Sequence, residues 1–217
     1  MKFGLVGFDG RLGSEVFNLF LEKEHSCVYK YSLGTEEETA VPDVLIDCSL
    51  PDVFEKSIEL VEKFESPFII GTTGLTEKHF AELKRIAQKV PVVQSFNFSI
   101  GIQVLLQLAK QADEIVPDWD VEISETHHRF KKDKPSGTAL MIKDAVDREE
   151  VNMSSLRLGN VAGDHTISFG GLGEVLSINH RALSRRTFAE GILKSAEFAA
   201  NAKPGFYTFT EVLFKNK

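Results

Sequence analysis

Two histidines and a group of lysines stand close together near the middle of the chain, and residues of these types can transfer protons to a bound anion. His127 and His128 precede Lys131, and a Pro-Ser-Gly turn leads from there to Thr138. Histidine has an unperturbed pKa near neutrality, and a partly desolvated lysine can give up a proton, so either can act as a general acid. Gly137 lets the backbone approach a ligand, and a helix beginning near Thr138 would point N–H groups at a carboxylate. The stretch predicts an anion site; a solvated basic loop is the alternative.

The composition makes this local cluster of positive charge more informative. The chain has 217 residues, 42% of them hydrophobic, and a formal net charge of −7. An acidic protein repels polyanions on average, so we expect no nucleic-acid partner, and the basic segment is better suited to attracting a small anion.

No apolar stretch approaches the roughly 20 residues that span a bilayer, and no signal peptide is recognisable at the start. Cys27 and Cys48 are the only cysteines and lie in apolar runs. We therefore expect a cytoplasmic protein with no disulfide framework, no membrane contact and no metal site.

A glycine-rich segment near the N-terminus predicts a dinucleotide-binding loop. Gly7, Gly10 and Gly13 follow an apolar run at residues 2–8 and open a segment with helical spacing. Their spacing is GxxGxxG rather than GxGxxG, so a tight turn between strand and helix is the alternative. The order of strand, loop and helix favours cofactor binding, because the helix N-terminus can receive a pyrophosphate.

The elements around this loop predict a Rossmann-like doubly wound parallel sheet. Apolar runs at residues 27–31, 44–48, 68–70 and 91–94 are typical of buried strands, and helices are expected between them, one with Ser49 as its N-cap and another capped by Thr76. This alternation favours a right-handed α/β fold. The acidic run at residues 36–38 is interpreted as a solvated loop.

The second half of the chain predicts an α+β domain with an open mixed sheet. Ser99 is expected to cap a helix, and residues 119–125, 166–169 and 174–180 alternate apolar with polar side chains, as strands covered on one face do. We expect a dinucleotide-binding domain at residues 1–98 and 187–217 and a substrate-binding and oligomerisation domain at residues 99–186. The uncovered face of the sheet is expected to be partly apolar and to bind further copies of the chain.

Cofactor choice depends on the end of the second strand. Many NAD enzymes carry a carboxylate there, whereas this chain has Lys30 and, in the glycine loop, Arg11. Both cations are expected to meet a 2′-phosphate, which makes NADPH at least as acceptable as NADH.

The segment from Glu125 through Leu140 resembles the signature of the 4-hydroxy-tetrahydrodipicolinate reductase family, long called dihydrodipicolinate reductase. Residues 159–166 and 180–189 extend the resemblance, which spans nearly the whole chain. Two departures are visible: Lys134 stands where the family usually has alanine, and the nucleotide domain is shortened between Tyr31 and Val44.

This resemblance implies NAD(P)H-dependent reduction of 4-hydroxy-tetrahydrodipicolinate to tetrahydrodipicolinate in lysine and diaminopimelate biosynthesis, by a homotetramer acting on a small dicarboxylate. It implies catalytic roles in proton transfer for His127 and Lys131 and substrate-carboxylate binding by His128, Gly137 and Thr138. Residues 71–73 and 95–98 follow buried strands and match the family's cofactor segments. The expected cofactor-binding residues are Gly7, Phe8, Asp9, Gly10, Arg11, Leu12, Lys30, Gly71, Thr72, Thr73, Ser95, Phe96, Asn97 and Phe98.

Other functions remain open from the residues alone. The same fold would suit a dehydrogenase acting on another small amino acid or keto acid. A non-catalytic dinucleotide-binding regulator and a weak nucleic-acid binder using residues 127–134 are further alternatives, although neither explains the Ser-Gly-Thr turn after the cations.

Overall fold

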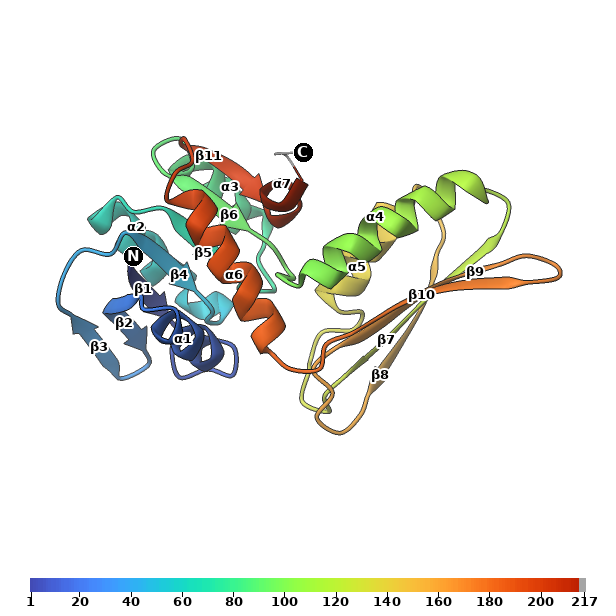
Figure 1. Cartoon of the computed structure of the whole chain (residues 1–217), viewed down its shortest axis with the longest axis horizontal. Helices are drawn as coiled ribbons and strands as arrows, with labels where there is room; N and C mark the ends of the chain where they lie inside the picture. The colour runs from blue at the N-terminus through green and yellow to red at the C-terminus, as the bar shows by residue number, and fades with distance from the viewer. Residues whose placement is uncertain (215–217) are drawn as a thin grey trace. The chain divides into compact units, whose positions relative to one another are not determined.

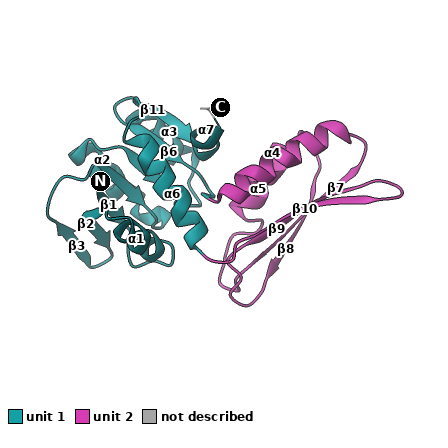
Figure 2. Cartoon of the chain, in the orientation of Figure 1, with its two compact units in different colours: residues 1–98, 185–217 teal, residues 99–184 magenta. Residues whose placement is uncertain are grey.

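A computed structural model describes residues 1–214, which form two compact units. Unit 1 contains residues 1–98 together with the chain from Arg185 onward, and unit 2 contains residues 99–184 (Figure 2). The last three positions of the segment predicted at residues 187–217 lie outside the described residues.

Unit 1 is built on a seven-stranded sheet with the strand order β11-β6-β5-β4-β1-β2-β3. All neighbouring strands are parallel except the pair β2 and β3. The chain runs outward from β1 in one direction to β2 and in the other through β4, β5 and β6, so the order switches at β1 and β4. The strands are β1 (Lys2–Val6), β2 (Ser26–Ser32), β3 (Thr35–Glu38), β4 (Val44–Asp47), β5 (Phe68–Ile70), β6 (Pro91–Gln94) and β11 (Gly205–Thr208).

Helices cover both faces of this sheet, which explains why its central strands are apolar on both sides (Figure 1). One hydrophobic cluster joins Phe3, Leu5 and Ile46 to helices α1 and α6, and a second joins Val6, Leu45 and Ile70 to α2 and α3. The predicted doubly wound α/β fold is confirmed. The helices are α1 (Gly13–Glu22), α2 (Phe54–Phe64), which follows the short 3-10 helix η1 (Pro51–Val53), α3 (Glu77–Ile86), α6 (Arg186–Ala199) and α7 (Phe209–Phe214).

Two local predictions for unit 1 are wrong. The acidic run expected in a solvated loop forms the edge strand β3, whose exposed carboxylates face lysines of neighbouring elements: Lys30 pairs with Glu37 and Lys56 with Glu36. Ser49 does not cap the following helix, because its hydroxyl donates instead to the carboxylate of Asp47 at 2.5 Å. Thr76 caps α3 as predicted.

Unit 2 consists of a four-stranded mixed sheet, ordered β10-β9-β7-β8, with two helices on one face (Figure 1). Strands β7 and β8 are parallel, and the other pairs are antiparallel. Ser99 caps α4 by accepting a hydrogen bond from the backbone of Ile102, as expected. The elements are α4 (Ile100–Ile115), β7 (Asp120–His127), α5 (Gly137–Ala145), β8 (Asn152–Arg157), β9 (Asp164–Gly170) and β10 (Val175–Arg181).

The uncovered face of this sheet is mostly polar, and the exposed apolar side chains of Leu156 and Val175 also lie on it. Apolar side chains of β7 and β9, such as Ile123 and Phe169, point toward the helices and are buried. On the other face polar side chains bond one another: Ser168 to Ser177 at 2.9 Å, and Asn179 to Thr166 at 2.7 Å. The sheet therefore does not expose a broad hydrophobic surface on that side.

Within residues 1–214, no helix combines the length and apolar character needed to cross a membrane.

Candidate active site and cofactor pocket

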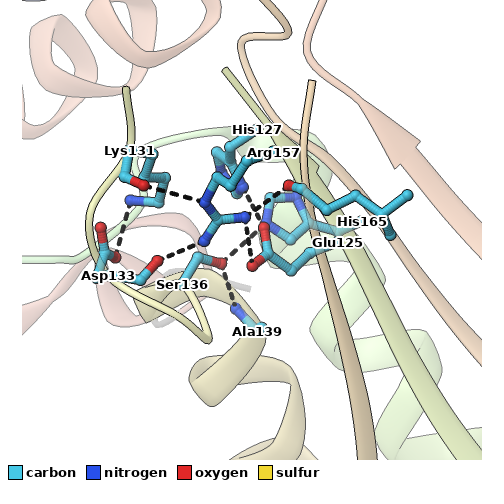
Figure 3. Close-up of polar contacts among 9 residues, drawn as sticks. Glu125, His127, Lys131, Asp133, Ser136, Ala139, Arg157 and His165 are labelled. Atoms are coloured by element: carbon cyan, nitrogen blue, oxygen red, sulfur yellow. Dashed lines mark hydrogen bonds and ion pairs between the residues drawn. The ribbon is translucent and has the colours of Figure 1, made fainter. Parts of the chain in front are cut away.

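Three strands of unit 2 bring titratable side chains together on the covered face of the sheet. Alternation along β7 places Glu125 and His127 on the same face as the buried Ile123. The sheet register sets His165 of β9 opposite Glu125 and Arg157 of β8 opposite His127. Because side chains of registered residues share a face, these four groups converge at the end of β7 (Figure 3).

Glu125 is the centre of this cluster. One of its carboxylate oxygens is hydrogen-bonded to Nδ1 of His127, and the other accepts from Nη1 of Arg157 at 2.9 Å. Burial by itself would raise the pKa of Glu125, but hydrogen bonds from Ser155, His127 and Arg157 hold it below its usual range. The residue is therefore a carboxylate, and it directs Nε2 of His127 away from itself.

Burial lowers the pKa of His127, against the opposing effect of the neighbouring Glu125 carboxylate. The Nε2 atom of the ring lies beside Gly163, where an added Cβ would stand only 3.2 Å away. A neutral ring with its proton on Nδ1 would offer Nε2 as a proton acceptor, and the protonated ring would offer a donor there.

His165 packs against His127 with ring centroids 5.0 Å apart. Its Nε2 lies 3.4 Å from the hydroxyl of Ser136, and its buried Nδ1 has no hydrogen-bond partner among residues 1–214. Burial lowers its pKa to about 3, so this ring is neutral at physiological pH.

The same three acidic and imidazole groups could in principle hold a metal ion, since ligand atoms of Glu125, His127 and His165 lie within 4.8 Å of one another. Both oxygens of Glu125 already accept hydrogen bonds, one of them from the Arg157 guanidinium, which would repel a cation. We therefore interpret the cluster as a hydrogen-bonded proton-transfer site.

The loop that follows β7 carries Lys131 and is held by Arg157. The Lys131 ammonium lies 2.8 Å from a carboxylate oxygen of Asp133. Arg157 donates to the backbone carbonyl of Lys131 at 3.2 Å and to that of Asp133. One guanidinium thus fixes both Glu125 and the lysine-bearing loop.

Helix α5 begins where the sequence predicted, and Ser136 is its N-cap, accepting from the backbone of Ala139 at 3.1 Å. Gly137 and Thr138 form its first turn, and Thr138 is buried, as is His128 at the start of the loop. The structure therefore gathers the predicted substrate residues on one loop and one helix N-terminus, next to His127 and Lys131.

Sequence reasoning assigned no role to Glu125, Arg157 or His165. Glu125 stands two residues before His127 in an alternating strand, and this spacing is a signal for a shared face. Arg157 gave no such signal, because the strand that carries it was not predicted. Strand β8 lies at the sheet edge, and its only apolar residues, Met153 and Leu156, do not make the usual alternating pattern.

A separate cavity of about 430 Å³ lies in unit 1, at the carboxyl ends of β1 and β4. This is the point where the strand order switches, which is where ligands bind in open α/β sheets. The predicted residues Gly7, Asp9, Gly10 and Arg11 line it, whereas Phe8 and Leu12 pack against the core. The sequence did not indicate the remaining lining residues, which are Tyr31, Ser32, Leu33, Cys48, Ser49, Leu50 and Val53.

Two glycines of the loop are required by the backbone itself. Gly7 has φ of +80°, and an added Cβ would lie 2.9 Å from the Cα atom of Ser49. A Cβ on Gly13 would lie 1.9 Å from the carbonyl oxygen of Gly7, so only glycine allows α1 to start this close to the strand. Leu12 supplies no side-chain cap to α1, which leaves its N-terminus suited to an anion such as a pyrophosphate.

The other predicted cofactor segments follow the neighbouring strands β5 and β6, at the carboxyl ends of the strands of the same sheet. Thr72 is buried and donates to Asp47 at 3.0 Å. Ser95 donates to the carbonyl of Asn97 at 2.8 Å, and Phe98 packs beside Gly71. Thr73 is exposed and Phe96 is half-buried. None of these residues lines the cavity at the glycine loop.

Lys30 also lies outside that cavity, so the structure does not bring Lys30 and Arg11 together on its wall. Its ammonium is 3.1 Å from Glu37 and 5.2 Å from the centroid of the Phe8 ring. Lys30 lines a different, smaller depression with Glu37 and Thr39. Lys30 lies there because the edge strand β3, which was not predicted, pairs with β2 and places Glu37 opposite Lys30.

The doubly wound sheet, the glycine loop at its switch point and the cluster around Glu125 are features typical of NAD(P)-dependent oxidoreductases. Comparison with known sequences specifies the family. Residues 29–98 match the profile of the dihydrodipicolinate reductase N-terminus, and residues 101–213 match that of its C-terminus. This chain belongs to the dihydrodipicolinate reductase family.

Individual relatives agree with this assignment. The 4-hydroxy-tetrahydrodipicolinate reductase of Thermosipho africanus is 48% identical over 213 residues, covering 98% of both chains. The enzyme of the same name from Rickettsia akari is 35% identical over 236 residues, covering 98% of this chain and 96% of its own. The dipicolinate-bound dihydrodipicolinate reductase from Paenisporosarcina sp. TG-14 shares the fold, with a TM-score of 0.77 at 22% identity, covering 97% of this chain and 98% of that one.

Proposed function

We propose that this chain reduces 4-hydroxy-tetrahydrodipicolinate to tetrahydrodipicolinate in lysine and diaminopimelate biosynthesis. In the balanced reaction, the substrate, NAD(P)H and one proton yield tetrahydrodipicolinate, NAD(P)⁺ and water. The observation that carries the proposal is the cluster of Glu125, His127 and Lys131 beside the N-terminus of α5, in a chain whose relatives bear the name of this reductase.

Unit 1 would hold the cofactor, and its residues fit that role. Gly7 and Gly10 open a cavity at the start of α1, and Arg11 adds a positive charge to its wall. When bound, the nicotinamide supplies the hydride for the reduction. The segments at residues 71–73 and 95–98 are proposed to lie along the cofactor as well.

Unit 2 would bind the dicarboxylate substrate. The N–H groups at Gly137 and Thr138 are suited to one carboxylate, because the positive end of the helix dipole lies there. His128 is proposed to assist from the preceding loop. The resemblance to a family whose member from Paenisporosarcina was solved with dipicolinate supports a substrate of this class.

Proton transfer is assigned to His127 and Lys131. Glu125 fixes the orientation of His127, so that Nε2 is available to accept or donate a proton. Lys131 would supply the proton that accompanies reduction, and Asp133 holds its ammonium in position. Arg157 orients both parts, since it bonds Glu125 and two carbonyls of the lysine loop.

We infer that the enzyme is a homotetramer and works in the cytoplasm. No element within residues 1–214 covers the second face of the unit 2 sheet, and the family resemblance favours four copies. Both cysteines are free thiols, which suits a reducing compartment.

The decisive experiment is an assay of NAD(P)H absorbance with freshly generated 4-hydroxy-tetrahydrodipicolinate. We expect loss of absorbance only when enzyme, substrate precursor and reduced cofactor are all present. Absence of turnover with this substrate, combined with turnover of another keto acid, would instead support a dehydrogenase of different specificity.

A further inference from the structure

The end of strand β2 in this chain lacks the carboxylate that commonly binds the adenosine ribose in dinucleotide-binding sheets. Strand β2 ends at Ser32, a hydroxyl residue. A carboxylate nevertheless reaches this point from the glycine loop, because the Ser32 hydroxyl donates to Oδ1 of Asp9 at 2.6 Å. The two residues together present an acidic group where the strand alone does not.

Asp9 and Ser32 both line the cavity of about 430 Å³ at the glycine loop, with Tyr31 and Leu33. Asp9 is exposed on the cavity wall. No ion pair within residues 1–214 involves its carboxylate, whose described partner is the Ser32 hydroxyl. Its second oxygen is thus available to a ligand in the cavity.

Of the two cations near this position, Arg11 and Lys30, Arg11 lines the cavity. Lys30 is paired with Glu37 and lines a separate depression, whereas Arg11 lines the cavity. A ribose diol can donate hydrogen bonds to a carboxylate, but a 2′-phosphate cannot and is repelled by it. In this cavity, the carboxylate of Asp9 would therefore favour NADH, and the guanidinium of Arg11 would favour NADPH.

We infer that Asp9 is a specificity-determining residue, which binds the adenosine ribose hydroxyls of NADH and is held in place by Ser32. The carboxylate lies on the glycine loop rather than at the end of the second strand, and Ser32 links the two positions. This inference rests on the proposed NAD(P)H-dependent function.

The test measures the Kd of NADH and of NADPH by calorimetric titration of the full-length enzyme, with kcat/KM for each cofactor measured in parallel. Asp9→Asn keeps the shape and removes the charge. A hydrogen bond to a charged group corresponds to about tenfold to a hundredfold in affinity. We expect the ratio of the NADH Kd to the NADPH Kd to rise by about tenfold or more in this variant.

Two further variants make the result specific. Glu59→Gln removes an exposed carboxylate from α2, outside the cavity, and should leave the ratio unchanged. The double variant Asp9→Ser with Ser32→Asp places the carboxylate on the strand and keeps the hydroxyl–carboxylate pair, so we expect it to restore most of the discrimination.

A ratio that changes less than about twofold in Asp9→Asn would overturn the inference while leaving the reductase function intact. The expected change in Kd together with no turnover of the dicarboxylate would support Asp9 as the ribose-binding residue and contradict the substrate assignment. Failure of the wild-type enzyme to bind either cofactor would overturn both.

Discussion

At the scale of single residues, burial and hydrogen bonding set the protonation states of the neighbouring titratable groups of the site. Glu125 is ionised although buried, since three donors stabilise its charge. His165 is neutral because burial outweighs every other influence on it. His127 lies between these two and is the imidazole that the Glu125 carboxylate orients. The same face of one sheet therefore holds groups with distinct protonation states.

Replacing Lys131 tests its assignment as a proton donor. We expect Lys131→Ala to lower kcat by about 10²–10⁴-fold, the usual contribution of a general acid, with little change in the Kd of the cofactor. Lys132 is exposed and adjacent, so Lys132→Ala is the matched control and should retain nearly full turnover. Wild-type kcat in a folded Lys131→Ala enzyme would remove this residue from the mechanism.

The role of Glu125 as a positioning residue is tested by the pH dependence of catalysis. Because the Glu125 carboxylate raises the pKa of His127 against the effect of burial, Glu125→Gln should shift the histidine limb of the kcat profile toward lower pH. Glu125→Asp retains a carboxylate and should move this limb less. A merely structural role would lower kcat without displacing the limb, and such a result would contradict the assignment.

At the scale of elements, edge strands decide which side chains reach the sites. Strand β8 brings Arg157 to the register position opposite His127. Strand β3 places Glu37 beside Lys30, and the resulting ion pair lies outside the cavity at the glycine loop. Both strands are short and lie at the sheet margins, where few side chains are buried, so their sequences lack a clear apolar pattern.

Cofactor binding by charge variants tests this effect of β3. We expect Arg11→Ala to weaken NADPH more than NADH, because a guanidinium gains charge-assisted hydrogen bonds from a phosphate. Lys30→Ala should affect the two cofactors equally and only slightly, since its partly exposed pair with Glu37 is worth about 0–1 kcal/mol. Calorimetric titration distinguishes the two residues. A selective loss of NADPH binding in Lys30→Ala would show instead that Lys30 binds the 2′-phosphate.

At the scale of the whole molecule, each unit has its own core, and the two differ in how completely their sheets are covered. The sheet of unit 1 has a hydrophobic cluster on each face. The sheet of unit 2 has a hydrophobic cluster on its helical face and a mostly polar surface opposite. Stability and assembly are therefore expected to respond to different parts of the chain.

Acid stability should report the buried His165. Its pKa is about 3 in the folded protein and 6.5 as a free group, so folding disfavours protonation. The stabilising contribution is complete above pH 6.5 and is lost as the pH falls toward 3, by at most about 1.4 kcal/mol per pH unit. Unfolding free energies measured by urea titration between pH 7 and 4 should fall less steeply for His165→Gln. Equal slopes for both proteins would contradict this.

Assembly is tested by light scattering at micromolar concentration, where we expect a mass near four copies of the 24.2 kDa chain. Ser168→Arg introduces a charge at the centre of the polar face of the unit 2 sheet and should lower the mass if copies meet there. Ser14→Arg, on α1 in unit 1, is the control. A single-chain mass for the wild-type protein would contradict the proposed tetramer.

The sequence by itself determined the class of fold and the segment proposed for catalysis. Apolar strands that alternate with amphipathic helices leave few alternatives to a doubly wound sheet, because buried parallel strands must be apolar on both faces. The segment from Glu125 to Leu140 carries its chemistry in consecutive residues, so the anion site around His127 and Lys131 and a helix beginning near Thr138 were predictable from local signals.

Only the tertiary structure decided which distant groups meet these residues. Arg157 and His165 reach Glu125 through strand register, and Ser32 reaches Asp9 through the closeness of the glycine loop to the end of β2. Likewise Ser49 bonds Asp47 rather than capping a helix, and Lys30 pairs with Glu37 across an unpredicted strand pair. Contacts between side chains far apart in the chain depend on the register and the packing of whole elements, whereas a sequence pattern records only the burial and local geometry of each element separately.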